Sequence, residues 1–168
     1  QIYWPFSEDW DKETMPIITF DPEDGSEVNI GYRLVDDKGF RRIEEVIVED
    51  GVEKIGVEVF AGCRKLKSVT LPVSFERKKD YRFSSLFRGC RELERVRLGN
   101  DNETYYCNGS VLLEKETRTV IDGWGIDRCY VGNGFVRLKA KKIGRRAFEG
   151  HELLAEVTLP ETLEEIDE

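Results

Sequence analysis

Apolar and polar residues alternate in several short segments of the chain. In the segment 66–71 (LKSVTL), apolar side chains alternate with the hydroxyl-bearing Ser68 and Thr70. Successive side chains of a strand point to opposite faces, so this pattern predicts a short strand with one buried face. The inward positions recur twice along the chain, giving the sets Leu66, Val69 and Leu71, then Leu93, Val96 and Leu98, then Leu154, Val157 and Leu159.

These alternating segments belong to an internal repeat. Residues 55–72 match residues 143–160 position for position without a gap, and residues 86–98 form a weaker third copy. Two pairs of equivalent positions, Val48 with Leu71 and Val136 with Leu159, have the same separation in sequence. This separation gives a period of about 23 residues, which is typical of proteins that stack one short structural unit many times.

The repeat also carries an aromatic residue and a glycine at fixed positions. Each phenylalanine is followed two residues later by a glycine, in the pairs Phe60 and Gly62, Phe87 and Gly89, and Phe148 and Gly150. The glycines are predicted to adopt positive φ at a turn, and the phenylalanines to stack as a second apolar column. A further repeat position, three residues after each phenylalanine, holds Cys63, Cys90 and His151.

A unit this short cannot bury its apolar face alone, so its copies must stack on one another. The predicted fold is an α/β-type repeat solenoid with mostly β content, a right-handed coil of short parallel strands over residues 41–168. Regular rungs are expected near 43–71, 72–98 and 137–159. Residues 160–168 repeat the opening of a rung and stop before its phenylalanine, so further repeats are expected to follow.

The middle of the chain departs from the period. Leu71 and Leu98 lie further apart than one period, by about four residues, which predicts an inserted loop near 77–80. Residues 99–136 are interpreted as an irregular, hairpin-like rung. Its two predicted strands, 108–113 and 119–124, flank a polar turn at 114–118.

Residues 1–40 lie outside the repeat. Two β-prone runs, 17–20 and 28–32, flank the segment 21–26, whose proline and glycine are strong turn residues. This arrangement predicts an N-terminal β-hairpin cap. The alternative interpretation makes these residues the end of a preceding module.

The charge balance excludes some partners. The chain has 26 lysines and arginines against 34 aspartates and glutamates, a formal net charge of -8. A negative chain is a poor match for nucleic acid or an anionic membrane surface, and non-acidic partners are favoured. No apolar run approaches the roughly 18 residues that a membrane-spanning helix needs, so membrane insertion is not expected.

Catalytic and metal-binding motifs are not apparent in the sequence. His151 is the only histidine, and it occupies the repeat position of Cys63 and Cys90, which favours a structural role over that of a general base. The sequence lacks a Cys-x-x-Cys motif, a nucleophile–base pair and a distinct pair of carboxylates. We therefore expect a protein that is not an enzyme and that binds no metal and no cofactor.

Cysteines and asparagines raise two further questions. Cys63 and Cys90 fall at repeat positions and are interpreted as buried thiols that pack like small apolar residues. Cys107 and Cys129 lie in the irregular rung, where a disulfide between them is an open hypothesis. Two Asn-x-Ser/Thr sequons begin at Asn102 and Asn108; they matter only in a eukaryotic secretory pathway, and chance matches are common.

The repeat pattern Ile-Gly-x-x-x-Phe-x-x-Cys-x-x-Leu-x-x-Val-x-Leu-Pro resembles the BspA-like, or treponemal-type, leucine-rich repeat family. The resemblance covers residues 43–167, and the hairpin-like rung is also similar to an irregular unit of that family. It departs from the pattern at His151 and in the long third copy. The resemblance implies a curved solenoid on the cell surface or secreted, with a role in adhesion and protein binding.

Outward strand positions are the candidate binding surface. They mix acidic, hydroxyl and basic groups, and no aromatic stripe recurs on them, which argues against a sugar platform or a base-stacking groove. A protein ligand, such as a host or neighbouring-cell surface protein, is therefore expected; the alternative is a passive spacer that presents another domain. The candidate residues are Glu45, Ile47, Ser68, Thr70, Arg95, Arg97, Glu156 and Thr158.

Overall fold

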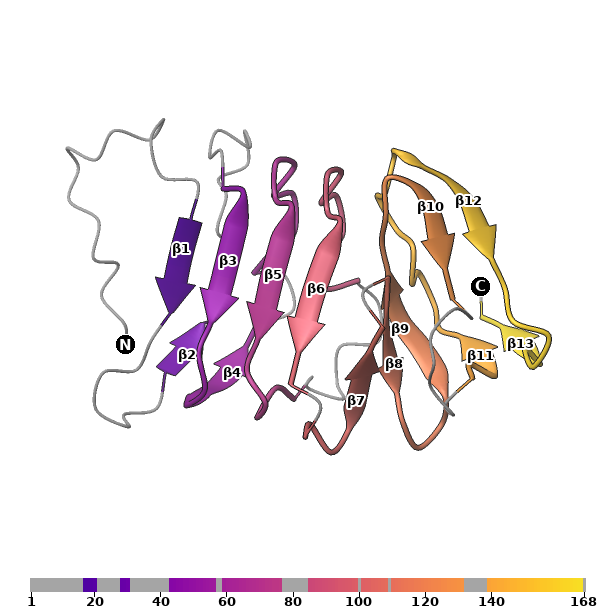
Figure 1. Cartoon of the computed structure of the whole chain (residues 1–168), viewed down its shortest axis with the longest axis horizontal. Helices are drawn as coiled ribbons and strands as arrows, with labels where there is room; N and C mark the ends of the chain where they lie inside the picture. The colour runs from indigo at the N-terminus through magenta and orange to yellow at the C-terminus, as the bar shows by residue number, and fades with distance from the viewer. Residues whose placement is uncertain are drawn as a thin grey trace.

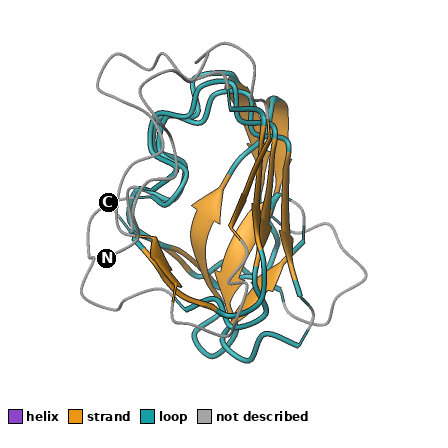
Figure 2. Ribbon diagram, turned by 90° about the vertical axis from the view of Figure 1, so that its left-hand side faces the viewer, coloured by secondary structure: helices purple, strands orange, loops and turns teal. Residues whose placement is uncertain are grey.

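The structure, a computed structural model, shows a coil of short strands and turns. It describes residues 17–20, 28–30, 43–56, 59–76, 85–99, 101–108, 110–131 and 139–167. Within these ranges there are strands and turns and no helix. Figure 1 shows the strands standing side by side along the long axis, and Figure 2, which looks along that axis, shows them gathered away from a side made of loops. The predicted class, a mostly β solenoid of parallel strands, is confirmed.

The first wall of the coil is a parallel sheet. Its strands follow the order β1 (Ile17–Phe20), β3 (Glu45–Val48), β5 (Ser68–Leu71) and β6 (Arg95–Leu98). Val46 lies beside Val69 and Val69 beside Val96, so the step along the chain from β5 to β6 is longer than the step from β3 to β5. These three valines are at most 2 % exposed. The inserted loop predicted near 77–80 lies outside the described residues.

The N-terminal strands form a rung, not a hairpin. β1 pairs in parallel with β3, and β2 (Val28–Ile30) pairs in parallel with β4 (Val52–Ile55). The predicted β-hairpin cap is therefore wrong, although both strands exist. Two β-prone runs with a turn between them are compatible with either a hairpin or a rung. The rung forms because the edges of β3 and β4, which are distant in sequence, offer unpaired backbone groups to these strands.

The irregular rung contains an antiparallel meander. β7 (Tyr105–Cys107) pairs with β8 (Val111–Glu114), and β8 pairs with β9 (Thr119–Gly123), so the hairpin of the middle segment is confirmed. β9 then pairs in parallel with β11 (Lys142–Ile143), and β11 with β13 (Glu165–Ile166), and each of these steps is one regular period of the repeat. The meander and the parallel strands β11 and β13 thus form one five-stranded sheet, which is a second wall of the coil.

The strands of the last pair, β10 (Asp127–Tyr130) and β12 (Leu154–Thr158), are separated in sequence by more than one regular period. They pair in parallel, with Thr158 beside Tyr130. The regular step predicted from Val136 to Leu159 is therefore not the step between these strands. The sequence match begins only at residue 143 and could not locate the preceding strand. Val136 itself lies outside the described residues.

Aromatic rings fill the centre of the coil. Phe60 and Phe87 stack with ring centroids 5.4 Å apart, and Trp124 meets Phe87 edge-on at 5.4 Å. Phe148 packs against Gly123, where a β-carbon would collide with its ring. The predicted phenylalanine column thus holds for its first two members, and Trp124 of the irregular rung supplies the next ring.

Glycines stack on the loop side of the coil. Gly62, Gly89 and Gly150 all have positive φ, between 75° and 79°. A β-carbon on Gly150 would lie 2.6 Å from the backbone nitrogen of Gly89, and the backbone nitrogen of Gly62 donates to the carbonyl of Arg88 at 2.8 Å. The turn after Phe148 therefore lies directly against the turn after Phe87, although the whole irregular rung separates the two phenylalanines in sequence.

Candidate interaction surface

The outward side chains of the first wall form two rows across three strands. Register places Glu45 beside Ser68 and Ser68 beside Arg95, and a second row runs through Ile47, Thr70 and Arg97. Neighbouring strands are about 4.8 Å apart, so each row presents its side chains at that spacing. The structure therefore brings six of the eight candidate residues together on one face, which we call the outer face.

The groups on the outer face differ in exposure. The four residues on β3 and β5 are half-buried, whereas Arg95 and Arg97 are exposed. The hydroxyl of Ser68 donates to the carboxylate of Glu45 at 2.9 Å. Neither Arg95 nor Arg97 makes an ion pair or a hydrogen bond through its side chain with another described residue.

The other two candidate residues lie on a separate sheet. Glu156 and Thr158 are on β12, which pairs with β10 and is not hydrogen-bonded to β6. Glu156 lies 3.4 Å from Arg128, which also lies 3.9 Å from Asp127. A hydrogen bond with Tyr130, then the charge of Glu156, raises the pKa of Arg128.

Arg128 and Tyr130 were not among the sequence candidates. β10 falls in the irregular segment, where no repeat copy aligns with it. The alternation of exposed Arg128 with buried Cys129 is the signal that could have identified the strand.

Side chains from the irregular rung bridge the gap between β6 and β10. The thiol of Cys107 donates to the carbonyl of Val96 on β6 at 3.2 Å, and the amide of Asn108 donates to the carbonyl of Tyr130 on β10 at 3.3 Å. Two consecutive residues thus donate hydrogen bonds to one backbone carbonyl of β6 and one of β10, across the break between these strands. No backbone ladder joins these two strands, so the side chains of Cys107 and Asn108 are the described hydrogen-bonding contacts across the break.

None of the four cysteines is in a disulfide, so the hypothetical disulfide between Cys107 and Cys129 is not formed. The thiol of Cys129 donates to the carbonyl of Ser110 at 3.4 Å, and that of Cys90 to the carbonyl of Phe60 at 3.0 Å. Burial raises the pKa of Cys129 to about 11 and that of Cys90 well above its ordinary value. Both therefore remain protonated donors at neutral pH.

His151 is buried among the turns of the coil, where it is 6 % exposed. Burial lowers its pKa to about 4, and a contact with the backbone of Cys90 opposes that shift. Neither ring nitrogen has a hydrogen-bond partner of normal geometry among the described residues. A neutral, enclosed imidazole is poorly placed to exchange protons with a substrate.

Both sequon asparagines hold the backbone of the irregular rung. Asn102 is 3 % exposed; its amide nitrogen donates to the carbonyls of Val73 and Phe75, and its oxygen accepts from the backbone nitrogens of Thr104 and Tyr105. Asn108 accepts from two backbone nitrogens in the same way. The nitrogen that a glycan would modify is engaged at both positions.

The described residues offer neither a metal-binding cluster nor a helix suited to spanning a membrane. No group of three histidine, cysteine, aspartate or glutamate side chains is arranged to hold a metal ion there. The same residues include no helix with the length and apolar character that crossing a membrane requires.

Comparison with known protein families shows which family the chain belongs to. A model of the BspA type leucine rich repeat region, with six copies, matches residues 38–110 and 129–168. The chain belongs to this family. The gap in the match contains β8 and β9, so the BspA-type pattern lapses within the meander, after its first strand β7. Repeats of this family are protein-interaction modules and are generally non-catalytic. No curated protein and no solved structure matches the chain.

Proposed function

We propose that this BspA-type repeat region is a non-enzymatic binding module on a cell surface or in the secreted space, which adheres to a protein ligand through the outer face. The observation that carries the proposal is the pair of outward rows on β3, β5 and β6. The opposite side of each strand is packed into the core, so these side chains stand on a rigid support. Rigid presentation of side chains lowers the entropic cost of binding.

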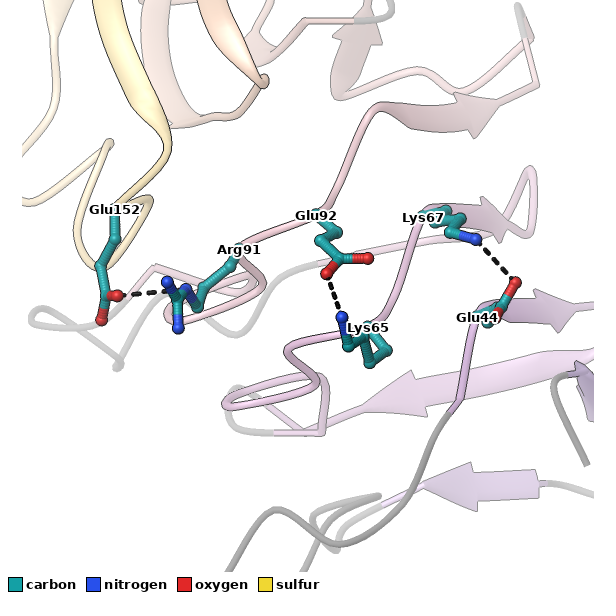
Figure 3. A network of polar contacts seen from close by, with 6 residues as sticks. All are labelled: Glu44, Lys65, Lys67, Arg91, Glu92 and Glu152. Carbon is teal, nitrogen blue, oxygen red and sulfur yellow. Dashed lines mark hydrogen bonds and ion pairs between the residues drawn. The ribbon is translucent and has the colours of Figure 1, made fainter. Parts of the chain in front are cut away.

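The alternative is a passive spacer that presents another domain. Ion pairs between successive rungs favour this function, because they tie the coil together along its axis. Figure 3 shows them in the turns and at the starts of strands: Glu44 with Lys67, Lys65 with Glu92, and Arg91 with Glu152. Such exposed pairs contribute roughly 0.2–1 kcal/mol each, so they stiffen the coil only modestly.

A capture experiment with a bulky substitution separates the two functions. Thr70 is central on the outer face, and Thr70→Trp obstructs any partner that contacts the face, whatever its charge. The matched control is Thr117→Trp, in the exposed turn between β8 and β9. Immobilised protein is incubated with detergent-solubilised surface and extracellular-matrix proteins, and captured proteins are identified by mass spectrometry.

The binding function predicts a protein that the wild type and Thr117→Trp capture and that Thr70→Trp loses. Capture that survives Thr70→Trp would place the binding surface elsewhere. If no protein is captured under any condition, the spacer function is favoured.

A further inference from the structure

The charges on the outer face and on the neighbouring β10–β12 surface are unevenly matched. Glu45 accepts a hydrogen bond from Ser68, and Asp127 and Glu156 both contact Arg128. Arg95 and Arg97 are exposed and have no acidic partner among the described residues. Both belong to a chain with eight more acidic than basic groups, and they share one face of β6.

Other basic side chains of the coil pair across rungs. Lys65, Lys67, Arg91, Lys141 and Lys142 each contact an acidic side chain of a neighbouring rung. In these five pairs, the acidic partner stands at the equivalent position one rung away. At Arg95 and Arg97, register supplies Ser68 and Thr70 instead, which cannot neutralise a guanidinium.

The two arginines have a defined spacing. They are two residues apart on one strand, so their side chains leave the same face about 7 Å apart. Each guanidinium has five N–H donors in a planar fork that matches a carboxylate. The hydroxyls of Ser68 and Thr70 lie one strand away, and β6 is the last hydrogen-bonded strand of its sheet.

We propose that Arg95 and Arg97 bind an acidic segment of the protein ligand, in extended conformation, with carboxylates on alternate residues. Alternate side chains of an extended segment share one face at the same spacing of about 7 Å, so two carboxylates meet two guanidinium groups. This inference rests on the proposed function and adds the chemistry of the partner.

The net charge of -8 favours non-acidic partners, but it acts over the whole molecule. At physiological ionic strength charges are screened beyond about 8 Å, so the local pair dominates once a short acidic segment is in contact. A nucleic acid carries charge along its whole length and requires a broad basic surface, which the chain lacks by composition.

Binding of a defined peptide tests the proposal. The probe is a fluorescein-labelled twelve-residue peptide of alternating glutamate and serine, measured by fluorescence anisotropy at low and physiological salt. The test variant is Arg95→Glu/Arg97→Glu. The control variant, Arg64→Glu/Lys139→Glu, makes the same change of net charge at two exposed residues away from the outer face.

We expect the test variant to bind at least tenfold more weakly than the wild type, and the control variant to bind within about twofold of it. Arg95→Lys/Arg97→Lys should retain part of the affinity, since charge remains and the planar fork is lost. A peptide of alternating lysine and serine should not bind. Thermal melts of each variant show that the fold is intact.

Equal binding by the wild type and the test variant would overturn the proposal, as would equal losses in the two glutamate variants, or no binding of the acidic peptide at low salt. This failure can be told apart from failure of the proposed function. If Thr70→Trp loses a captured surface protein that Arg95→Glu/Arg97→Glu still captures, the outer face binds its ligand, but not through an acidic segment.

Discussion

At the scale of single residues, Asn102 shows how one polar side chain organises the irregular rung. Its amide makes four hydrogen bonds to backbone groups of two separate segments, 73–75 and 104–105. A buried amide is stable only when its donors and acceptors are all engaged, and here they are.

Replacing Asn102 with alanine should therefore destabilise the protein by roughly 2–4 kcal/mol, because four backbone groups lose their partner, some of them buried. Urea unfolding followed by circular dichroism measures the change. Glu103→Ala, at the exposed neighbouring position, serves as the control and should change the free energy of unfolding by less than about 0.5 kcal/mol. Equal effects of the two substitutions would contradict the assignment.

His151 is the residue through which pH acts on the coil. Its pKa is about 4 in the folded protein and about 6.5 when exposed, so the unfolded chain binds its proton first as pH falls. The contribution to stability is thus complete above pH 6.5, declines from there to pH 4, and then levels off, with a total loss of up to about 3 kcal/mol.

Unfolding by urea at pH 7.5, 5.5 and 4.5 measures this dependence, with His151→Cys as the comparison, since cysteine occupies the same repeat position in two other rungs. The difference in stability between the wild type and the variant should shift against the wild type as pH falls. A difference that stays constant across the range would refute burial of a neutral imidazole.

At the scale of elements, the stacked glycine turns are a contact on which neighbouring rungs depend. Gly89 needs positive φ, but a β-carbon there meets its neighbours at ordinary distances. Gly150 needs the same conformation, and its β-carbon would also collide with the backbone of the adjoining turn.

Gly89→Ala should therefore cost about 1–2 kcal/mol from backbone strain alone, and Gly150→Ala more than that, because a backbone contact cannot move aside as a side chain can. Differential scanning calorimetry of the two variants gives the comparison. The pair is its own control, and a Gly150→Ala variant as stable as Gly89→Ala would show that the turns separate without cost.

The strands also show how much of this fold can be predicted from the sequence. The alternation around Val69 and Val96 located the strands of the first wall, because one face is buried and the other is solvated. The N-terminal strands were found and their pairing was wrong, since local turn residues carry no information about a strand edge more than a full rung further along the chain. Trp124 and Arg128 were missed because they lie in or beside the meander, where the repeat lapses.

The candidate surface was predictable to a similar extent. Period-2 alternation placed Ser68, Thr70, Arg95 and Arg97 outward, and the shared register brought them together. It could not show that β12 belongs to a second sheet, since the break depends on how Cys107 and Asn108 contact the strands on either side.

At the scale of the whole molecule, two of the sheets, β1-β3-β5-β6 and β10-β12, form two stretches on either side of that break. Within the first wall, backbone ladders connect every neighbouring pair of strands. Between β6 and β10, the described contacts to strand carbonyls come from the side chains of Cys107 and Asn108. The two stretches should therefore move relative to each other more than strands within one sheet.

Spin labels test this motion by electron–electron distance measurement. Labels at Thr70 and Thr158 lie on opposite sides of the break, and the distance between them should have a broader distribution than the distance between labels at Ile47 and Arg97 within the first wall. Asn108→Ala should broaden the first distribution further and leave the second unchanged. Distributions of equal width would show that the break is as stiff as the ladder.

The stacked glycine turns give such motion a direction. On the loop side the turns after Phe87 and Phe148 touch, backbone against backbone, while on the strand side the same two stretches are separated by the irregular rung. The contact between these turns should therefore act as a pivot, so that relative motion of the two stretches changes their separation on the strand side. A ligand that contacts both Arg97 and Arg128 would fix the distance between the two stretches on that side.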